Sequence, residues 1–324
     1  MAGVRSGVTN ISWAVAGGLA AWAAARLTAA DRVRRTAIPA VPLLSFTPQV
    51  AGTAPWAVLG LRLARQRQPA AMAALAAAAL GVLVGSRAIP RPQPAVRGPM
   101  LRLLSANLYR GQADAEVIAD IVRQVDADVL FLQELTADAV TRLKQAGLGD
   151  LMPHTQLELR GGGSRGSGIY SRFPLGEGTR LAPTRAAQPT AVLELPSGKA
   201  VELVCVHPAV PASRIGGAVQ WREELAVLPP PGELPRVLAG DFNATLDHAA
   251  FRDVLRLGYA DAALQAGKAL APTWGPPGKG ALLTLDHVLV DRRCAVRACS
   301  VHLVPGSDHR AVYAEIQLSQ EGVS

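Results

Sequence analysis

Three long apolar stretches dominate the first ninety residues of the chain. They occupy residues 11–30, 38–63 and 69–89, and each reaches the roughly 20 residues that a helix needs to cross the hydrocarbon core of a bilayer. Several prolines fall within the second stretch, where they would kink or shorten its helix. The pattern therefore predicts a membrane anchor over residues 1–90, built from about three transmembrane helices.

The pattern changes after residue 90. Residues 91–100 are rich in proline and predict an extended linker. Short apolar runs, amphipathic stretches and Gly/Pro turns then predict an α/β domain over residues 101–319. The runs predicted to form strands are Leu101–Ala106, Asp128–Leu132, Gly168–Ser171, Val201–His207, Val237–Ala239, Leu285–Val290 and Ala311–Leu318. The stretches predicted to form helices are Ala115–Val125, with Asp114 as its cap, and Arg214–Leu228.

The net charge of +8 is distributed unevenly along the chain. The part before Met100 holds eleven arginines, no lysine and one acidic residue, a net charge of +10, whereas the remainder carries −2. A domain that binds a long nucleic acid usually presents a basic surface of its own. Because the predicted α/β domain is mildly acidic overall, a long nucleic acid is the less favoured partner.

The cysteines give no indication of a metal or redox site. Cys205, Cys294 and Cys299 lack the spacing of metal ligands, and an odd number cannot all pair within one chain. We expect all three to pack as small apolar residues in the core.

Polar residues that could bind a metal or take part in catalysis lie at or just beyond the ends of the apolar runs, where strands place side chains at the rim of a sheet. Each alone has a structural explanation as a cap or turn residue. Together they offer the oxygen ligands that Mg²⁺ prefers, together with imidazoles and without thiolates. These residues are Asn107, Glu134, His207, Asp241, Asn243, Asp286, Asp308 and His309.

The ordered motifs N…QE…SR-x-P…H-P…GDFN…DH…SDH resemble those of the endonuclease/exonuclease/phosphatase superfamily, which has the DNase I-like fold. The resemblance covers about residues 101–318, and the GDFN, LDH and SDH motifs occur in the expected order. It implies a four-layer α/β/β/α sandwich, here preceded by the bundle of predicted transmembrane helices.

The resemblance also implies a set of metal ligands. Glu134 resembles the principal Mg²⁺ ligand, Asn107 a residue beside it that contacts metal or phosphate, and Asp308 a second ligand. Mn²⁺ would suit the same oxygen donors. Several nuclease members carry an acid two residues after the asparagine, whereas this chain has Tyr109, which counts against a second metal site.

The remaining residues match catalytic positions of the superfamily. Asp241 and His309 resemble the groups that activate the attacking water, and the resemblance leaves open which of the two removes the proton. Asp286 resembles the acid partnered with His309, Asn243 the donor that holds the phosphate, and His207 the imidazole that steadies the phosphoryl oxygens.

Membership of this superfamily would indicate the reaction more closely than the substrate. The plan of anchor plus domain resembles actinobacterial membrane phosphatases linked to teicoplanin-type glycopeptide resistance, which are thought to act on polyprenyl pyrophosphate carriers. We therefore predict a membrane-anchored, Mg²⁺-dependent hydrolase of a phosphate or pyrophosphate ester, with the lipid bilayer and a small or lipid-linked phosphoester as partners. The alternatives are a membrane-tethered endonuclease/exonuclease and a non-catalytic membrane-binding module.

The expected location is the cell membrane, as a multi-pass protein. With three spans, more arginines flank the domain side of the helices than the opposite side, which favours a cytoplasmic domain. The family analogy and the proline-rich linker favour an extracytoplasmic domain, and this is the topology predicted here.

Overall fold

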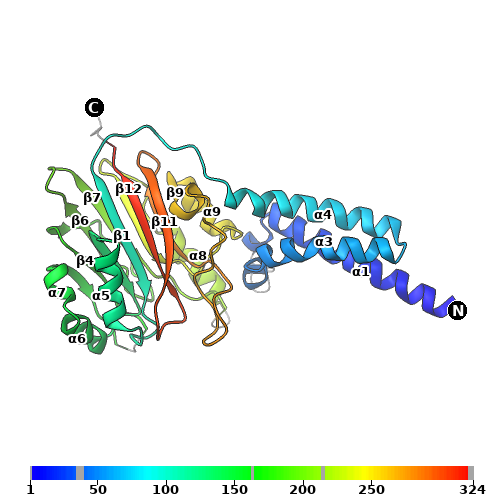
Figure 1. Cartoon of the computed structure of the whole chain (residues 1–324), viewed down its shortest axis with the longest axis horizontal. Helices are drawn as coiled ribbons and strands as arrows, with labels where there is room; N and C mark the ends of the chain where they lie inside the picture. The colour runs from blue at the N-terminus through cyan, green and yellow to red at the C-terminus, as the bar shows by residue number, and fades with distance from the viewer. Residues whose placement is uncertain (1, 34–39, 162–163, 213–215, 320–324) are drawn as a thin grey trace.

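Two six-stranded sheets packed face to face form the body of the protein in a computed structural model that describes residues 2–33, 40–161, 164–212 and 216–319 (Figure 1). The first sheet, in the order β11-β12-β1-β2-β4-β3, contains β1 (Met100–Asn107), β2 (Val129–Gln133), β3 (His154–Glu158), β4 (Ser167–Ser171), β11 (Ala295–Leu303) and β12 (Arg310–Gln317). The second, in the order β5-β6-β7-β8-β10-β9, contains β5 (Leu175–Glu177), β6 (Thr190–Glu194), β7 (Ala200–Val206), β8 (Arg236–Asp241), β9 (Tyr259–Asp261) and β10 (Asp286–Asp291). All seven strands predicted from the apolar runs are confirmed.

Helices cover the outer face of each sheet and complete an α/β sandwich. The first sheet is covered by α5 (Ala115–Gln124), α6 (Ala137–Gln145) and α7 (Leu148–Leu151). The second is covered by α8 (Gly217–Ala226) and α9 (Ala249–Arg256), while α10 (Ala262–Gln265) follows β9. Asp114 caps α5 as predicted, because its carboxylate accepts hydrogen bonds from the backbone N–H groups of Glu116 and Val117. The start of the other predicted helix, residue 214, lies outside the described residues.

The period of two along the central strands separates two cores. Leu101 and Leu103 of β1 face the opposite sheet and join the core between the sheets. Leu104 and Ala106 point the other way, into the core beneath the helices of the first sheet. Central strands buried on both faces explain why their sequences are almost continuously apolar.

Three helices precede the sandwich and project from it. We use the name helical arm for the described residues from 2 to 88, which include α1 (Ala2–Leu27), α3 (Thr47–Leu63) and α4 (Arg67–Gly85) (Figure 1). The segments 7–27 and 67–88 are long and apolar enough to cross a membrane. The described part of the second predicted span covers residues 40–63, in which a turn at residues 45–46 precedes the 17-residue α3, and α3 contains Pro55. Residues 38–39 lie outside the described residues. The bundle of three transmembrane helices stays a prediction.

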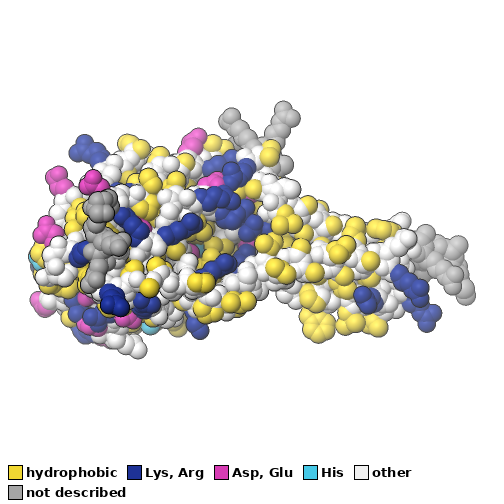
Figure 2. Space-filling model, turned by 90° about the horizontal axis from the view of Figure 1, so that it is seen from above, with side chains coloured by type: hydrophobic (Ala, Val, Ile, Leu, Met, Phe, Trp, Pro, Cys, Tyr) yellow, Lys and Arg dark blue, Asp and Glu magenta, His cyan; other side chains and the backbone are white. Residues whose placement is uncertain are grey.

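The surface of the helical arm is strongly apolar. Figure 2 shows hydrophobic side chains along the arm and basic side chains near its free end. Trp56 is 73% exposed, Leu63 76% and Leu75 75%, so large apolar groups cover the outside of the arm as well as its interior. Contiguous exposed apolar surface of this kind marks a region that contacts lipid or another protein.

The proline-rich segment between arm and sandwich has no regular secondary structure after the short 3₁₀ helix η2 (Ser86–Ala88). It lies along the sandwich, where the backbone N–H of Arg91 donates to the carbonyl of Gln265 and that of Gly98 donates to the carbonyl of Leu318. The segment therefore leads the chain from α4 across the sandwich to the start of β1 (Figure 1).

Candidate active site

Strand alternation brings four of the predicted site residues to the same rim of the sandwich. Residues 103, 203, 239 and 288 all face the core between the sheets. Two-residue periodicity therefore directs Asn107, Asp241 and Asp286 toward the mouth of that core, and His207 follows β7 on the same side. All four side chains are buried.

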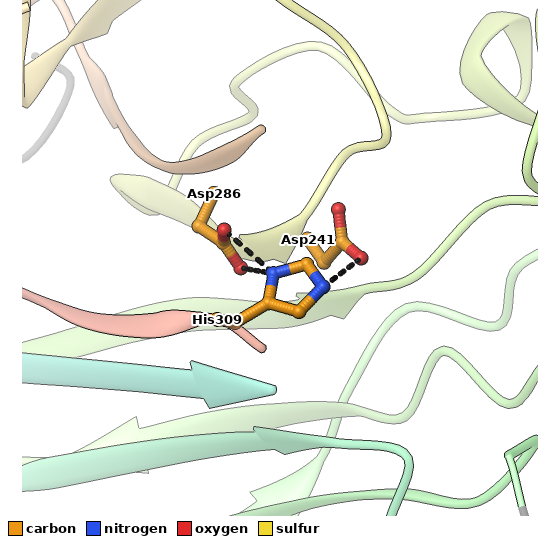
Figure 3. A group of neighbouring side chains, drawn as sticks. All are labelled: Asp241, Asp286 and His309. Atoms are coloured by element: carbon orange, nitrogen blue, oxygen red, sulfur yellow. Dashed lines mark hydrogen bonds and ion pairs between the residues drawn. The ribbon is translucent and has the colours of Figure 1, made fainter. Parts of the chain in front are cut away.

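A histidine lies between two of these carboxylates (Figure 3). The Nδ1 of His309 is 2.9 Å and 3.1 Å from the two carboxylate oxygens of Asp286. Its Nε2 points the other way, 3.7 Å from Oδ2 of Asp241 and 3.9 Å from Oδ1 of Asp308. The bond to Asp286 fixes the orientation of the ring, so Nε2 is the nitrogen directed at the centre of the site.

Asp241 is held by backbone and side-chain donors. Its Oδ1 accepts from the backbone N–H of Asn243 at 2.8 Å, and its Oδ2 accepts from the side-chain amide of Asn107 at 3.1 Å. Asn243 in turn donates its side-chain amide to the carbonyl of Pro208, beside His207. The site therefore connects β1 of the first sheet with β7 and β8 of the second.

Glu134 immediately follows β2 and completes the acidic side of the site. Its Oε2 accepts from the backbone N–H of Arg110 at 2.7 Å. Glu134 has a φ of 55° and Asn243 a φ of 48°, both in the left-handed region. For a residue such as glutamate this backbone costs about 1–3 kcal/mol, and such strain is concentrated at functional sites.

A family model described as "Endonuclease/Exonuclease/phosphatase family" matches residues 104–309, which include all of these residues. The chain belongs to the endonuclease/exonuclease/phosphatase family. Members of this family are metal-dependent hydrolases of phosphoric esters, of the phosphatase or nuclease type, and the chain is an enzyme of this class. No match was found among curated proteins.

Solved structures show the same fold. An endonuclease/exonuclease/phosphatase from Beutenbergia cavernae aligns with a TM-score of 0.54 and 22% identity, over 69% of this chain and 72% of that one. Humanized D. rerio TDP2 aligns with a TM-score of 0.54 and 20% identity, over 67% and 99%. An AP endonuclease from Archaeoglobus fulgidus aligns with a TM-score of 0.51 and 16% identity, over 66% and 98%.

Carboxylates are crowded at the site of this family member, and burial changes their titration. Burial raises the pKa of Glu134, the hydrogen bond from Arg110 opposes this shift, and the nearby charge of Asp241 adds to it. Burial likewise raises the pKa of Asp241 against the opposing effect of His309. A nearby cation would stabilise the charged forms of these carboxylates and lower their pKa values again.

The two imidazoles differ in charge. Burial lowers the pKa of His207 and keeps its ring neutral near pH 7. Burial also acts to lower the pKa of His309, but the carboxylates of Asp286 and Asp241 outweigh it and raise that pKa to about 10. Without a bound metal, the ring of His309 is therefore protonated near pH 7, whereas the ring of His207 is neutral.

Two groups of side chains in the site offer oxygen atoms to a metal. Asp241, Asp286 and His309 have ligand atoms within 4.8 Å of one another. However, Thr273 donates to Asp286 Oδ2 at 2.6 Å, and both oxygens of Asp286 already face His309, so this carboxylate is engaged in orienting the histidine.

Two of the predicted ligands, Asp308 and Glu134, have more freedom to bind a cation, whereas the side-chain oxygen of Asn107 accepts from the backbone N–H of Tyr109. Asp308 Oδ1 is buried without a hydrogen-bond partner among the described residues, and the hydrogen bond to Glu134 engages only its Oε2. Hard oxygen donors of this kind fit a divalent cation such as Mg²⁺ or Mn²⁺. The donor set around Glu134, Asn107 and Asp308 is therefore compatible with the metal dependence of the family.

Trp274 and Ser307 support the site although the sequence did not single them out, whereas His287 belongs to the DH motif and is expected to support or pack rather than to react. The indole N–H of Trp274 donates to Asp308 Oδ2 at 3.0 Å, and Ser307 donates to the carbonyl of Asn107. His287 is buried, with Nδ1 2.7 Å from Asp261 and Nε2 2.9 Å from the carbonyl of Ala244. His287 thus supports the loop after β8 rather than the reacting groups.

Proposed function

We propose that this protein is a membrane-anchored, Mg²⁺-dependent hydrolase that cleaves a phosphate or pyrophosphate ester carried by a lipid, such as a polyprenyl pyrophosphate. The observation that carries the hydrolase assignment is the buried Asp286–His309 pair directed at Asp241, at one rim with Glu134 and Asp308. An acidic centre of this kind can hold a divalent cation, and the cation would offset the negative charge on the phosphoryl oxygens of the substrate.

The proposed roles follow from the positions of the side chains. Bound through Glu134, with Asn107 and Asp308 nearby, Mg²⁺ would neutralise charge on the phosphoryl oxygens. Asp241 and His309 together activate the attacking water, and Asp286 keeps the ring of His309 turned toward Asp241.

Substrate binding is assigned to the opposite side of the centre. Asn243 and His207 lie close to Asp241 on the second sheet. The backbone N–H of Asn243 donates to Asp241 and one of its side-chain N–H groups donates to the carbonyl of Pro208. Its second side-chain N–H and the neutral ring of His207, whose Nδ1 has no partner among the described residues, would suit the phosphoryl oxygens. The phosphoryl group would thus lie between these donors and the acidic residues of the other sheet.

The helical arm supports a membrane location for this chemistry. Two of its helices are long enough to cross a bilayer, and its outer surface exposes large apolar side chains. Exposed apolar surface is stable in lipid, whereas in water it promotes association.

A cavity at the base of the arm supports a lipid-linked substrate. It has a volume of about 260 Å³ and lies between Pro48 of α3 and Leu270 and Leu282 of the sandwich. Leu246 also lines it, only three residues beyond Asn243. The cavity is lined by both apolar and polar side chains at the junction of arm and sandwich, and its apolar part suits the first carbons of a lipid chain.

The charges of the arm support an extracytoplasmic domain. The turn between α3 and α4 lies at the free end of the arm, beside the N-terminus, and carries the exposed Arg62, Arg65 and Arg67 (Figure 1). At the other end, Arg26 and Arg87 form ion pairs with Asp247 and therefore have a structural explanation. The positive-inside rule then favours placing the free end in the cytoplasm.

Substrate choice is tested with the full chain, purified in detergent micelles and supplied with Mg²⁺. Polyprenyl pyrophosphate and supercoiled plasmid DNA are offered separately, and phosphate release and strand nicking are measured. The proposal expects phosphate release without nicking. Nicking without phosphate release would make the protein a membrane-tethered nuclease, and inactivity on both would favour a binding module.

A further inference from the structure

A buried ion-pair cluster joins the helical arm to the loop that follows β8. Asp247 is fully buried, and its carboxylate accepts from both Arg87, at 2.9 Å and 2.5 Å, and Arg26, at 2.6 Å. Arg26 lies in the last turn of α1 and also donates to the carbonyl of Leu246 at 3.1 Å. An arginine from the last turn of α1 and an arginine just after α4 therefore meet on one carboxylate of the sandwich.

The neighbouring residues of the same loop are also held from the N-terminal segment. His248 Nε2 lies 2.8 Å from the carbonyl of Val41 and 3.2 Å from the hydroxyl of Ser45. The backbone N–H of Ala249 donates to the buried Asp31 at 2.6 Å. Three consecutive residues, 247 to 249, are thus fixed by groups that precede the catalytic domain.

The loop transmits this restraint toward the catalytic residues. Asp241 and Asp247 are separated by five residues, all of them buried. Thr245 closes the turn, since its N–H donates to His248 Nδ1 and its hydroxyl accepts from the N–H of Asp247. A packed, hydrogen-bonded turn moves as a unit, so a displacement of Asp247 should also move Asn243.

We propose that Asp247 is a positioning residue, through which the helical arm holds Asp241 and Asn243 in their catalytic arrangement. The arm is then part of the catalytic unit as well as a membrane anchor. This inference rests on the proposed roles of Asp241 and Asn243. The dependence of activity on the arm should hold for any phosphoester substrate, soluble or lipid-linked.

Because the side chains of Asp247 and its two arginine partners are buried or nearly buried, we expect removal of the arm to lower catalytic activity. Deleting the arm would leave Asp247 without either guanidinium, and an unpaired carboxylate in this environment is strongly unfavourable. The loop would then rearrange to hydrate Asp247, which moves the residues between it and Asp241. Activity on a soluble substrate would fall along with activity on a lipid.

The test compares variants of the full chain in detergent micelles, with the phosphoester that the wild-type enzyme hydrolyses fastest. Asp247→Asn removes the charge shared by the two arginines, and Arg26→Gln removes one arginine while leaving the two-point contact of Arg87. Asp253→Asn is the control, because it breaks another arm-to-sandwich ion pair, with Arg32, that lies on the half-exposed surface of α9.

Positioning predicts that Asp247→Asn and Arg26→Gln each lower kcat by about tenfold or more, as loss of a supporting contact does at other sites. The Mg²⁺ concentration for half-maximal activity should stay unchanged, because Glu134, the principal predicted ligand, follows β2 of the other sheet. Asp253→Asn should keep the wild-type kcat. A merely structural role would instead lower the folded fraction and leave kcat per folded molecule intact.

Wild-type kcat in folded Arg26→Gln protein would overturn the proposal, and this variant decides if Asp247→Asn does not fold. Asp241→Asn in the same assay distinguishes failure of the catalytic assignment from failure of the positioning role. Full activity in Asp241→Asn would refute the catalytic site itself, whereas inactivity there combined with normal kcat in the Asp247 and Arg26 variants would refute only the positioning role.

Discussion

At the residue scale, the site depends on side chains whose charges are unfavourable without a cation. Glu134 occupies a left-handed backbone position, and its carboxylate lies within the electrostatic reach of Asp241 and Asp308. Sequence position alone placed these acids at strand ends, but the strain and the crowding appear only in the folded chain. Both features indicate a site shaped for binding rather than for stability.

Replacement of Glu134 tests this interpretation through stability. Without metal, Glu134→Gln should be at least as stable as the wild type near pH 7, because burial and Asp241 disfavour the charged carboxylate. Mg²⁺ at a hundredfold excess over Kd should stabilise the wild type by about 2.7 kcal/mol and so raise its melting temperature. The melting temperature of the variant should not change. Thermal unfolding with and without Mg²⁺ measures both effects.

The exposed Glu223 offers a matched control for that substitution. Glu223→Gln should show the full Mg²⁺-dependent increase in melting temperature. An equal increase in Glu134→Gln would remove Glu134 from the metal site.

Thiol reactivity provides a second test at this scale. Burial raises the pKa of Cys205 to about 12, of Cys294 to about 11 and of Cys299 to about 12, so the reactive thiolate is scarce at pH 8. A maleimide reagent should leave the native protein unmodified and label three thiols after denaturation. Rapid labelling of any cysteine in the native protein, detected by mass spectrometry, would contradict this packing.

At the scale of elements, the sequence predicted the central strands well because they are buried on both faces and therefore continuously apolar. The four edge strands β3, β5, β9 and β11, and β6 beside β5, were missed, since each is short or partly exposed. Asn107 and Asp241 were found because they end strong strands. Thr273 was not, because it lies in a loop and becomes relevant only when the fold brings it to Asp286.

The end of β8 illustrates how an element sets the site. Gly240 precedes Asp241 with a φ of 151°, and a Cβ at this position would lie 2.0 Å from the carbonyl oxygen of Val206. Only glycine allows β7 and β8 to approach closely enough there for Asp241 and His207 to share one rim.

Gly240→Ala should therefore lower the free energy of unfolding by about 3 kcal/mol or more and reduce activity, because backbone must shift to admit the methyl group. Denaturant unfolding and the hydrolysis rate measure the two effects. Gly198→Ala is the control, since it also has a positive φ of 76° but no atom within 4 Å of the added Cβ, and it should cost only about 1–2 kcal/mol. Equal losses in both variants would contradict the steric argument.

At the scale of the whole molecule, the arm and the sandwich meet through a charged and partly polar interface. Arg26, Arg32 and Arg87 all pair with carboxylates of the sandwich, so arginines that suggested a cytoplasmic domain from the sequence have partners in the fold. Counting charges along the chain could not distinguish such structural arginines from those that report topology.

A reporter that fluoresces only in the cytoplasm, fused after the C-terminus, tests the topology. An extracytoplasmic sandwich predicts a dark fusion, while the same reporter inserted between Arg65 and Gln66, in the turn at the free end of the arm, should fluoresce. A bright C-terminal fusion together with a dark insertion would reverse the orientation.

The central claim is that a divalent cation and the Asp241–His309 pair hydrolyse a phosphoester at the rim between the sheets. The most direct measurement is phosphate release from polyprenyl pyrophosphate by the purified full chain, for wild type and Asp241→Asn, with Mg²⁺ and with a chelator. The account predicts release only by the wild type with Mg²⁺. Undiminished release by Asp241→Asn, or by the wild type in excess chelator, would contradict it.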